Sequence, residues 1–238
     1  MTKSKFTRSI NHISKVKEWD SYQPKDAKTL ILGSFNPYNK NLEEQTDFYY
    51  GRISNGRGNR LWSTIGKLKY NNENYFKGNL ENKLKELKES KVIFFDLINC
   101  IEFNSEGKKE LENYIESKVL GDFSDSSLWV SEAEDKNITL TREYNYQIID
   151  FLKKNTSIKK IITTLGNNRM ENLGLRKKNN GKYQKNKKDK NWIDFRKTVF
   201  KIIEQKNIEL ITESISPSPS RRPGDDGFDN WVKRYLLK

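Results

Sequence analysis

Four short apolar runs constrain the fold of this chain more than any other feature. Each is rich in β-branched or aromatic residues and too short for a buried helix: residues 29–35 (TLILGSF), 91–97 (KVIFFDL), 158–164 (IKKIITT) and 208–212 (IELIT). Helical patterns of apolar residues precede three of the runs, at residues 80–90, 143–154 and 194–205. Strands that alternate with helices predict a parallel sheet covered on both faces. We therefore predict a single domain over residues 1–238, a three-layer α/β/α sandwich with a four-stranded, mainly parallel sheet.

Polar loops follow all four predicted strands. They cover residues 34–41, 96–105, 165–169 and 213–224. In open α/β sheets, ligands bind just beyond the carboxyl ends of the strands. The sequence therefore predicts a functional site built from these loops.

The charge of the chain points to a polyanionic partner. The sequence has 45 lysine and arginine residues against 32 aspartate and glutamate residues, a formal net charge of +13. A basic surface attracts nucleic acid through long-range electrostatics and counterion release. The alternative is a lysine-rich surface with no binding role. Residues 176–190, which include Lys187 and Lys188, form a basic insertion that is either a clamp on phosphates or a solvated loop. A second predicted insertion covers residues 108–135.

Cysteine and histidine are scarce, and this limits the possible chemistry. Cys100 is the only cysteine and His12 the only histidine, so no intramolecular disulfide can form and zinc sites built on these residues are excluded. We expect His12 to be a surface residue in a mobile N-terminal extension, residues 1–24. No metal or cofactor is predicted. The sequence shows neither a signal core nor an apolar run of membrane-spanning length, so we expect a cytoplasmic monomer that does not bind membranes.

Five segments resemble motifs of the uracil-DNA glycosylase superfamily. The turn Gly33-Ser34-Phe35-Asn36-Pro37 is similar to the first active-site motif of the mismatch-specific uracil glycosylases. Further similarities to this branch and to the hypoxanthine-DNA glycosylase and uracil-specific branches lie in Tyr49-Tyr50, Gly58-Asn59-Arg60-Leu61-Trp62, residues 92–100 (VIFFDLINC) and Ser216-Pro217-Ser218-Pro219-Ser220-Arg221. Their order and their placement after predicted strands carry the resemblance, which runs from about residue 28 to the C-terminus, apart from the two insertions.

This resemblance implies a monofunctional DNA glycosylase that flips a base out of DNA and hydrolyses its N-glycosidic bond. Two residues receive catalytic roles: Asn36 would position the attacking water, and Ser216 would donate a hydrogen bond to the departing base. Base binding is assigned to Phe35, Tyr50, Asp96 and Asn99. In this assignment, one of Tyr49 and Tyr50 could instead belong to the core. Contacts to DNA are assigned to Asn59, Arg60, Ser218, Ser220, Arg221, Arg222, Lys187 and Lys188. Asn59 and Trp62 would also brace the site, and Cys100 would pack.

The sequence leaves the substrate open. One candidate is a deaminated base, uracil or hypoxanthine, excised in repair. The other is an enzymatically modified base, such as a decorated cytosine in phage DNA, excised in antiviral defence. Ser216 stands where other branches have the larger His or Asn, which leaves room for a bulkier base. A different class of function is a DNA- or RNA-binding protein that keeps the fold without catalysis.

Overall fold

The parallel sheet has the four strands that the sequence predicts. A computed structural model describes residues 5–40, 46–51, 53–54, 57–121, 137–165, 176–179, 182–185, 190–211, 213, 215, 217 and 225–237. The strands are β2 (Thr29–Gly33), β5 (Val92–Asp96), β8 (Lys160–Thr163) and β11 (Glu209–Ile211). They lie in the order β11-β8-β2-β5, and every neighbouring pair is parallel. The predicted four-stranded parallel sheet is confirmed.

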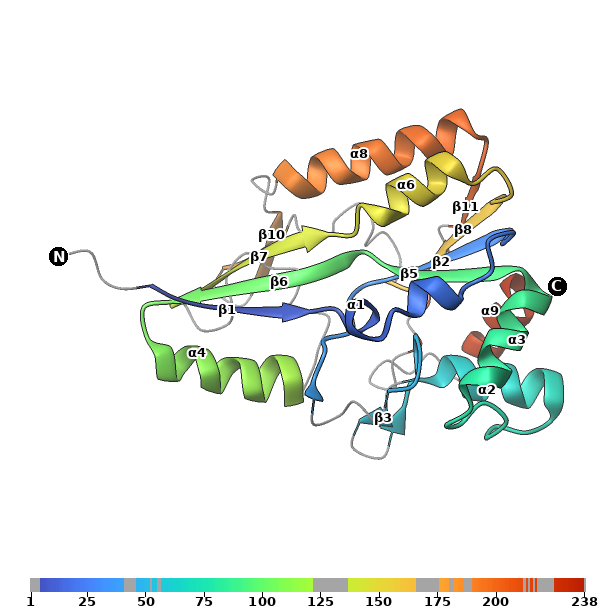
Figure 1. Cartoon of the computed structure of the whole chain (residues 1–238), viewed down its shortest axis with the longest axis horizontal. Helices are drawn as coiled ribbons and strands as arrows, with labels where there is room; N and C mark the ends of the chain where they lie inside the picture. The colour runs from blue at the N-terminus through green and yellow to red at the C-terminus, as the bar shows by residue number, and fades with distance from the viewer. Residues whose placement is uncertain are drawn as a thin grey trace.

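Helices cover both faces of this sheet because successive strand residues point to opposite sides. Leu30 and Leu32 belong to one apolar cluster, together with residues of α6 (Gln147–Lys154) and α8 (Lys190–Gln205). Ile31 belongs to a second cluster, together with residues of α2 (Arg60–Tyr70), α3 (Leu80–Ser90) and α9 (Asp225–Tyr235). The sheet is therefore the middle layer of three, with helices on either side (Figure 1).

The predicted helices are confirmed in two cases and partly wrong in the third. The helix α3 has the predicted bounds, and α8 begins four residues before the predicted start. The segment predicted as a helix over residues 143–154 divides instead into the end of β7 (Ile138–Tyr144) and α6, which begins at Gln147. Residues 138–144 alternate strictly between buried and exposed, the period of a strand.

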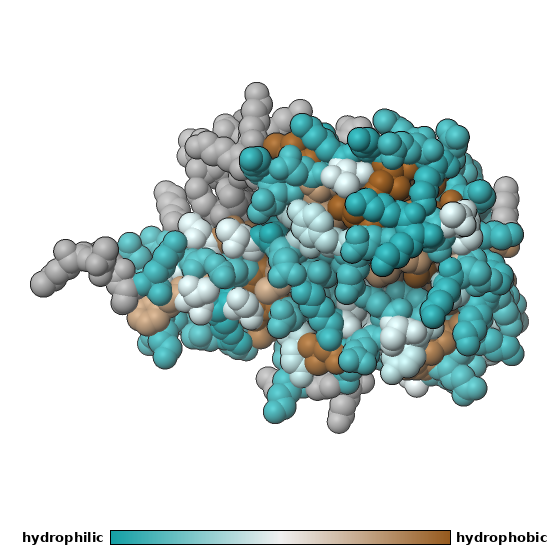
Figure 2. All heavy atoms as spheres, turned by 45° about the horizontal axis from the view of Figure 1, so that its top comes forward, coloured by the Kyte–Doolittle hydropathy of each residue, from teal (hydrophilic) through white to brown (hydrophobic). Residues whose placement is uncertain are grey.

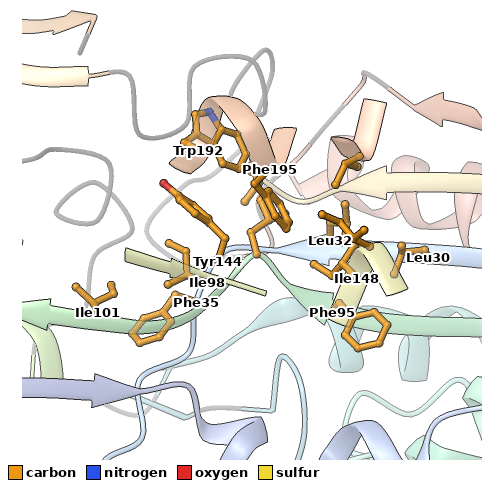
Figure 3. Packing of buried hydrophobic residues seen from close by; sticks show 14 of the residues in the cluster. Leu30, Leu32, Phe35, Phe95, Ile98, Ile101, Tyr144, Ile148, Trp192 and Phe195 are labelled. Atoms are coloured by element: carbon orange, nitrogen blue, oxygen red, sulfur yellow. The ribbon is translucent and has the colours of Figure 1, made fainter. Parts of the chain in front are cut away.

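A second sheet, which sequence analysis did not predict, extends from the carboxyl edge of the first. It is antiparallel, in the order β1-β6-β7, with β1 at Phe6–Asn11 and β6 at Ile98–Ser105. Because β5 leads into β6 with only Leu97 between them, the two sheets are joined along one long ribbon of chain (Figure 1). One apolar cluster continues from Leu30 and Phe95 of the parallel sheet to Ile98 and Ile101 of β6 (Figure 3).

The two segments interpreted as insertions contain regular structure. Residues 108–121 form α4 (Lys108–Tyr114) and a π-helical segment (Ile115–Gly121), and both bury apolar side chains in the core. In the basic segment, β9 (Arg176–Asn179) pairs with β10 (Lys182–Lys185) as an antiparallel hairpin. Lys187 and Lys188 lie outside the described residues.

The remaining described elements are short. They are α1 (Ile13–Lys17), a 3-10 turn (Trp19–Tyr22), and β3 (Ile53–Ser54) paired with β4 (Arg57–Gly58). Hydrophilic side chains predominate on the face shown in Figure 2, with apolar groups in patches between them. None of the described helices is both long and apolar enough to span a bilayer.

Candidate active site at the carboxyl edge of the parallel sheet

Three neighbouring strands end in a row of residues on one face of the sheet. Gly33 of β2 pairs in register with Asp96 of β5, and Thr164 follows β8, its backbone N–H bonded to the carbonyl of Leu32 at 3.0 Å. In the sheet, β5 lies on one side of β2, whereas β8 and then β11 lie on its other side. The strand order therefore reverses between β2 and β8. Ligand sites of open α/β sheets lie at such reversal points.

Gly33 leaves room for two oxygen atoms above the sheet. A Cβ atom at this position would lie 2.0 Å from Oδ1 of Asp96 and 2.6 Å from the hydroxyl oxygen of Tyr50. Neither distance is possible between non-bonded atoms. The absence of a side chain at Gly33 therefore allows Asp96 and Tyr50 to approach each other at the strand ends.

Tyr50 is held at this edge in a strained conformation. Its hydroxyl is 2.8 Å from Oγ1 of Thr164, and its ring centroid is 5.3 Å from that of Phe94. Its φ of 58° is in the left-handed region, which costs a non-glycine residue about 1–2 kcal/mol. The residue before Tyr50 is anchored by Trp62, whose Nε1–H donates to the carbonyl of Tyr49 at 2.6 Å. Strained residues of this kind cluster at functional sites.

The two adjacent tyrosines have different environments. Tyr49 is only 1% exposed and packs in the core against Trp19 and Phe94, whereas Tyr50 is half-buried. Tyr49 is therefore the core member of the pair, and Tyr50 is the one at the site.

Asp96 is paired with a residue that sequence analysis placed on the surface. His12 is 1% exposed, and its Nε2 lies 2.7 Å from Oδ2 of Asp96. The prediction of a mobile surface histidine is wrong because β1 pairs with β6 and carries His12 inward, where its backbone N–H donates to the carbonyl of Asn99 at 2.7 Å. Exposure alternates along residues 6–11, but Arg8 occupies one of the less exposed positions, so the sequence itself carries only a weak strand signal here.

Behind His12 the polar network continues into the protein. Nδ1 of His12 lies 2.7 Å from Oγ of Ser14, and the hydroxyl of Tyr49 donates to Oδ1 of Asp20 at 2.7 Å. Burial raises the pKa of Tyr49 well above its usual range, and the charges of Asp20 and Asp96 raise it further. Burial also raises the pKa of Asp20. These groups form a buried polar layer beneath the strand-end row.

Asn36 is fixed at the same edge by the N-terminal strand. Its carbonyl accepts from the backbone N–H of Ile13 at 2.9 Å, and the N–H of Tyr38 donates to the carbonyl of Asn11 at 2.8 Å. Pro37 and His12 form an isolated antiparallel bridge. Asn36 is half-buried, and no hydrogen bond to its side-chain amide occurs among the described residues. The amide is therefore held in place by its backbone and is available to a ligand.

Four further predicted site residues have structural contacts. Phe35 (4% exposed) and Asn99 (9% exposed) are buried, with the Phe35 ring centroid 5.6 Å from that of His12. Asn59 caps α2 by accepting from the N–H of Leu61 at 3.0 Å. The guanidinium carbon of Arg60 lies 5.1 Å from the ring centroid of Phe228, so this side chain packs on an aromatic face.

In the loop after β11, the structure describes residues 213, 215 and 217. Pro217 is buried, and its carbonyl accepts from the N–H of Arg60 at 3.1 Å, which ties this loop to the start of α2. The predicted residues Ser216, Ser218, Ser220, Arg221 and Arg222 lie outside the described residues.

A cavity of about 470 Å³ opens elsewhere, over β1, β6 and β7. Its lining includes Glu102 and Glu143, and none of the strand-end residues Asp96, Gly33 and Thr164. The lining has these two carboxylates against one guanidinium, that of Arg142, so the cavity is a poor match for a polyanion. Within the part of the chain that the structure describes, no group of three or more His, Cys, Asp or Glu residues could hold a metal ion.

In comparisons with models of protein families, with curated proteins and with solved structures, the chain matches none.

Proposed function

We propose that this protein is a monofunctional DNA glycosylase that flips a deaminated or enzymatically modified base out of DNA and hydrolyses its N-glycosidic bond, leaving an abasic site. The observation that carries the proposal is the close approach of Asp96 and Tyr50 above Gly33 at the carboxyl ends of the strands, with Asn36 three residues beyond the end of β2. These three residues come from separate segments, and each belongs to a motif that resembles the uracil-DNA glycosylase superfamily.

The chemistry requires little more than positioned polar groups and an aromatic face. The bond from the anomeric carbon of the sugar to the base nitrogen breaks and its electrons leave with the base. Water adds its oxygen to the anomeric carbon, and the proton that this water loses ends on the released base. A carboxamide can orient the water without acting as a strong base, and this suits a transition state with oxocarbenium character. Asn36 fits this role because its backbone is fixed and its amide is available.

The base would be held by stacking and by hydrogen bonds to its edge. The half-buried ring of Tyr50 can stack on a flipped base, a contact worth roughly 1–3 kcal/mol. The carboxylate of Asp96 is an acceptor for N–H groups. The net charge of +13 supplies the attraction to phosphates that the binding step needs.

Asn36→Ala tests the catalytic assignment. We expect this variant to bind DNA like the wild type and to release base at least about 100-fold more slowly in single-turnover assays, because removing one positioned polar group commonly costs that much. Substrates are duplexes that carry uracil, hypoxanthine, 5-hydroxymethylcytosine or glucosylated 5-hydroxymethylcytosine, and abasic sites are detected by alkaline cleavage.

The same substrates separate the rival interpretations. Release of uracil or hypoxanthine favours repair, and release of a modified cytosine favours defence. DNA binding without abasic sites on any substrate would identify a non-catalytic binding protein instead. A wild-type release rate in Asn36→Ala would remove Asn36 from the mechanism.

A further inference from the structure

The side chain of His12 lies behind Asp96, enclosed by aromatic rings. Its ring centroid is 5.6 Å from that of Phe35 and 5.9 Å from that of Tyr49. The His12 side chain is 2% exposed, whereas that of Asp96 is 9% exposed. A ligand at the strand ends can therefore touch Asp96 without touching His12, so His12 acts on such a ligand through the residues that it contacts, and Asp96 is the one to which it is hydrogen-bonded.

The hydrogen bonds of His12 determine which oxygen of Asp96 is available. The backbone N–H of Ser14 donates to Nδ1 at 3.1 Å, so in the neutral ring the proton is on Nε2. Nε2–H then donates to Oδ2 of Asp96 at 2.7 Å. This contact engages Oδ2, while Oδ1 lies above Gly33, beside the hydroxyl of Tyr50. A histidine fixed through its second nitrogen orients its partner in just this way at many ligand sites.

We propose that His12 is a positioning residue, which holds Asp96 so that Oδ1 accepts a hydrogen bond from an N–H group on the edge of a bound base. This inference rests on the proposed function, since it takes a nucleobase as the ligand. It also specifies the class of base: one with a ring N–H or an exocyclic amine facing Asp96, as uracil, hypoxanthine and cytosines with a free amino group have. A carboxylate accepts and cannot donate, so the site rejects a base alkylated at that nitrogen.

His12→Gln and His12→Leu test the positioning role. Leu removes the donor to Asp96, and we expect the single-turnover rate of base release to fall about 10- to 100-fold with little change in the Kd for DNA, because a hydrogen bond to a charged group is lost while phosphate contacts stay. Gln offers an N–H donor of similar reach and is expected to recover most of the loss. Val16→Gln, at an exposed position of α1, is the matched control and should leave the rate unchanged.

The outcomes of this set decide between a positioning role and a merely structural one. Equal losses in Gln and Leu that follow the loss of folding stability, measured by urea unfolding, would overturn the proposal. A wild-type release rate in a folded His12→Leu protein would also overturn it, while the proposed function would stand.

Paired substrates test the class of base. Duplexes carry uracil or 3-methyluracil, and cytosine or its N4-dimethyl derivative, and the release rate and the Kd are measured for each. Where the unmethylated base of a pair is released or bound, we expect its methylated partner to be released at least about 100-fold more slowly or bound at least about 100-fold more weakly. The methyl group removes the donor and leaves Oδ1 of Asp96 unpaired. Equal rates within each pair would contradict the assignment of Oδ1 as the reading atom.

Because His12 is the only histidine, its imidazole gives a single set of NMR signals in isotope-labelled protein. We expect these signals to show a proton on Nε2 and none on Nδ1. The chemical shift of Nε2 should change in the Asp96→Asn variant. A proton on Nδ1 instead would overturn the proposal without any assay of activity. If the wild type releases no base from any DNA, the proposed function fails, and this measurement still decides how His12 and Asp96 are oriented.

Discussion

Two buried carboxylates, Glu86 of helix α3 and Asp96 of strand β5, have different surroundings. Glu86 is 3% exposed and belongs to α3, which ends just before β5 begins, whereas Asp96 is 7% exposed and is the last residue of β5. Burying a charge is costly unless it is paired and hydrogen-bonded. Both sites meet this requirement, but within the part of the chain that the structure describes only Glu86 receives hydrogen bonds at both carboxylate oxygens.

Glu86 joins two helices. Nζ of Lys69 donates to Oε1 at 2.9 Å and to Oε2 at 2.7 Å, and the hydroxyls of Tyr70 and Ser90 donate at 2.8 Å and 2.5 Å. Burial by itself raises the pKa of Glu86, but the hydrogen bonds from Lys69, Ser90 and Tyr70 outweigh it and lower the pKa below its usual value. Such a saturated carboxylate holds α2 against α3 and has little capacity left for a ligand.

Asp96 is supported in a different way. His12 approaches Oδ2 from the protein side, and the missing side chain of Gly33 leaves Oδ1 beside the hydroxyl of Tyr50 at the strand ends. Burial and pairing alone therefore do not distinguish Glu86 from Asp96, to which we assign the reading of a base. What separates them is whether an oxygen is directed toward the edge of the sheet where ligands bind.

The largest effect is expected from Gly33→Ala. The new methyl group would lie 2.0 Å from Oδ1 of Asp96, so the carboxylate must turn away and its bond to His12 must lengthen. We expect base release to fall by at least about 100-fold, because a displacement of about 1 Å in an active site can cost that much. Overpacking should also lower the free energy of unfolding by about 1–3 kcal/mol.

Gly107→Ala is the matched control for this prediction. Its methyl group would also lie 2.0 Å from a carboxylate oxygen, Oε2 of Glu110, but Glu110 is exposed and free to move. Activity should therefore be retained. If Gly33→Ala behaves like Gly107→Ala in both activity and stability, the crowding at the strand ends has no functional meaning.

Glu86→Gln should have the opposite signature, a loss of stability with activity retained per folded molecule. Gln keeps one acceptor but removes the charge that pairs with Lys69, and we expect a loss of about 1–3 kcal/mol in the free energy of unfolding at neutral pH. The pKa of Glu86 is lower in the folded state, so its contribution is present above the ordinary pKa of 4.5 and is lost as the pH falls through the folded value.

Urea unfolding of the wild type and of Glu86→Gln across the acidic range measures this contribution of Glu86 to stability. The difference in stability between wild type and Glu86→Gln should shrink as the pH falls below about 4.5. A difference that is constant with pH would show that the cluster acts through packing and not through charge. A loss of catalytic rate at full folding would make Glu86 part of the site and would end the contrast with Asp96.

Much of the parallel sheet could be predicted from the sequence. Short runs such as residues 29–35 are apolar on both faces, a pattern that only a strand covered on two sides requires. The antiparallel sheet was missed although residues 138–144 alternate strictly, because Tyr144 and Ile148 also fit a helical spacing. Where a strand period and a helical period both fit one segment, the strand with which it pairs decides which structure forms. For β1 that partner is β6, which is distant in sequence.

The site was predictable in part, for a similar reason. Asn36 and Asp96 directly follow or end apolar strands, so their placement at one edge follows from the sheet itself. Thr164 directly follows β8 and so reaches the same edge through the sheet, whereas His12 reaches it through the pairing of β1 with β6 and is marked by no local motif. The expectation that His12 is a surface residue depended on an N-terminal segment thought to be mobile, and the pairing of β1 with β6 removes that premise.

The smallest effect is expected from Asp20→Asn, which tests the buried layer beneath the site. Burial raises the pKa of Asp20, while the hydroxyl of Tyr49 donates to its Oδ1. A raised folded pKa means that the contribution of Asp20 to stability is fully present below the ordinary pKa of 3.8 and is lost as the pH rises through the folded value. Asn is neutral at every pH and still accepts from Tyr49. Asp20→Asn should therefore equal the wild type in the free energy of unfolding at low pH and exceed it at neutral pH, by less than the change in Glu86→Gln.

Urea titrations of the wild type and Asp20→Asn at matched pH values measure both differences. A variant that is less stable than the wild type at neutral pH would show that the charge of Asp20 is needed, and that the polar layer under His12 is held together by ionic contacts and not by neutral hydrogen bonds.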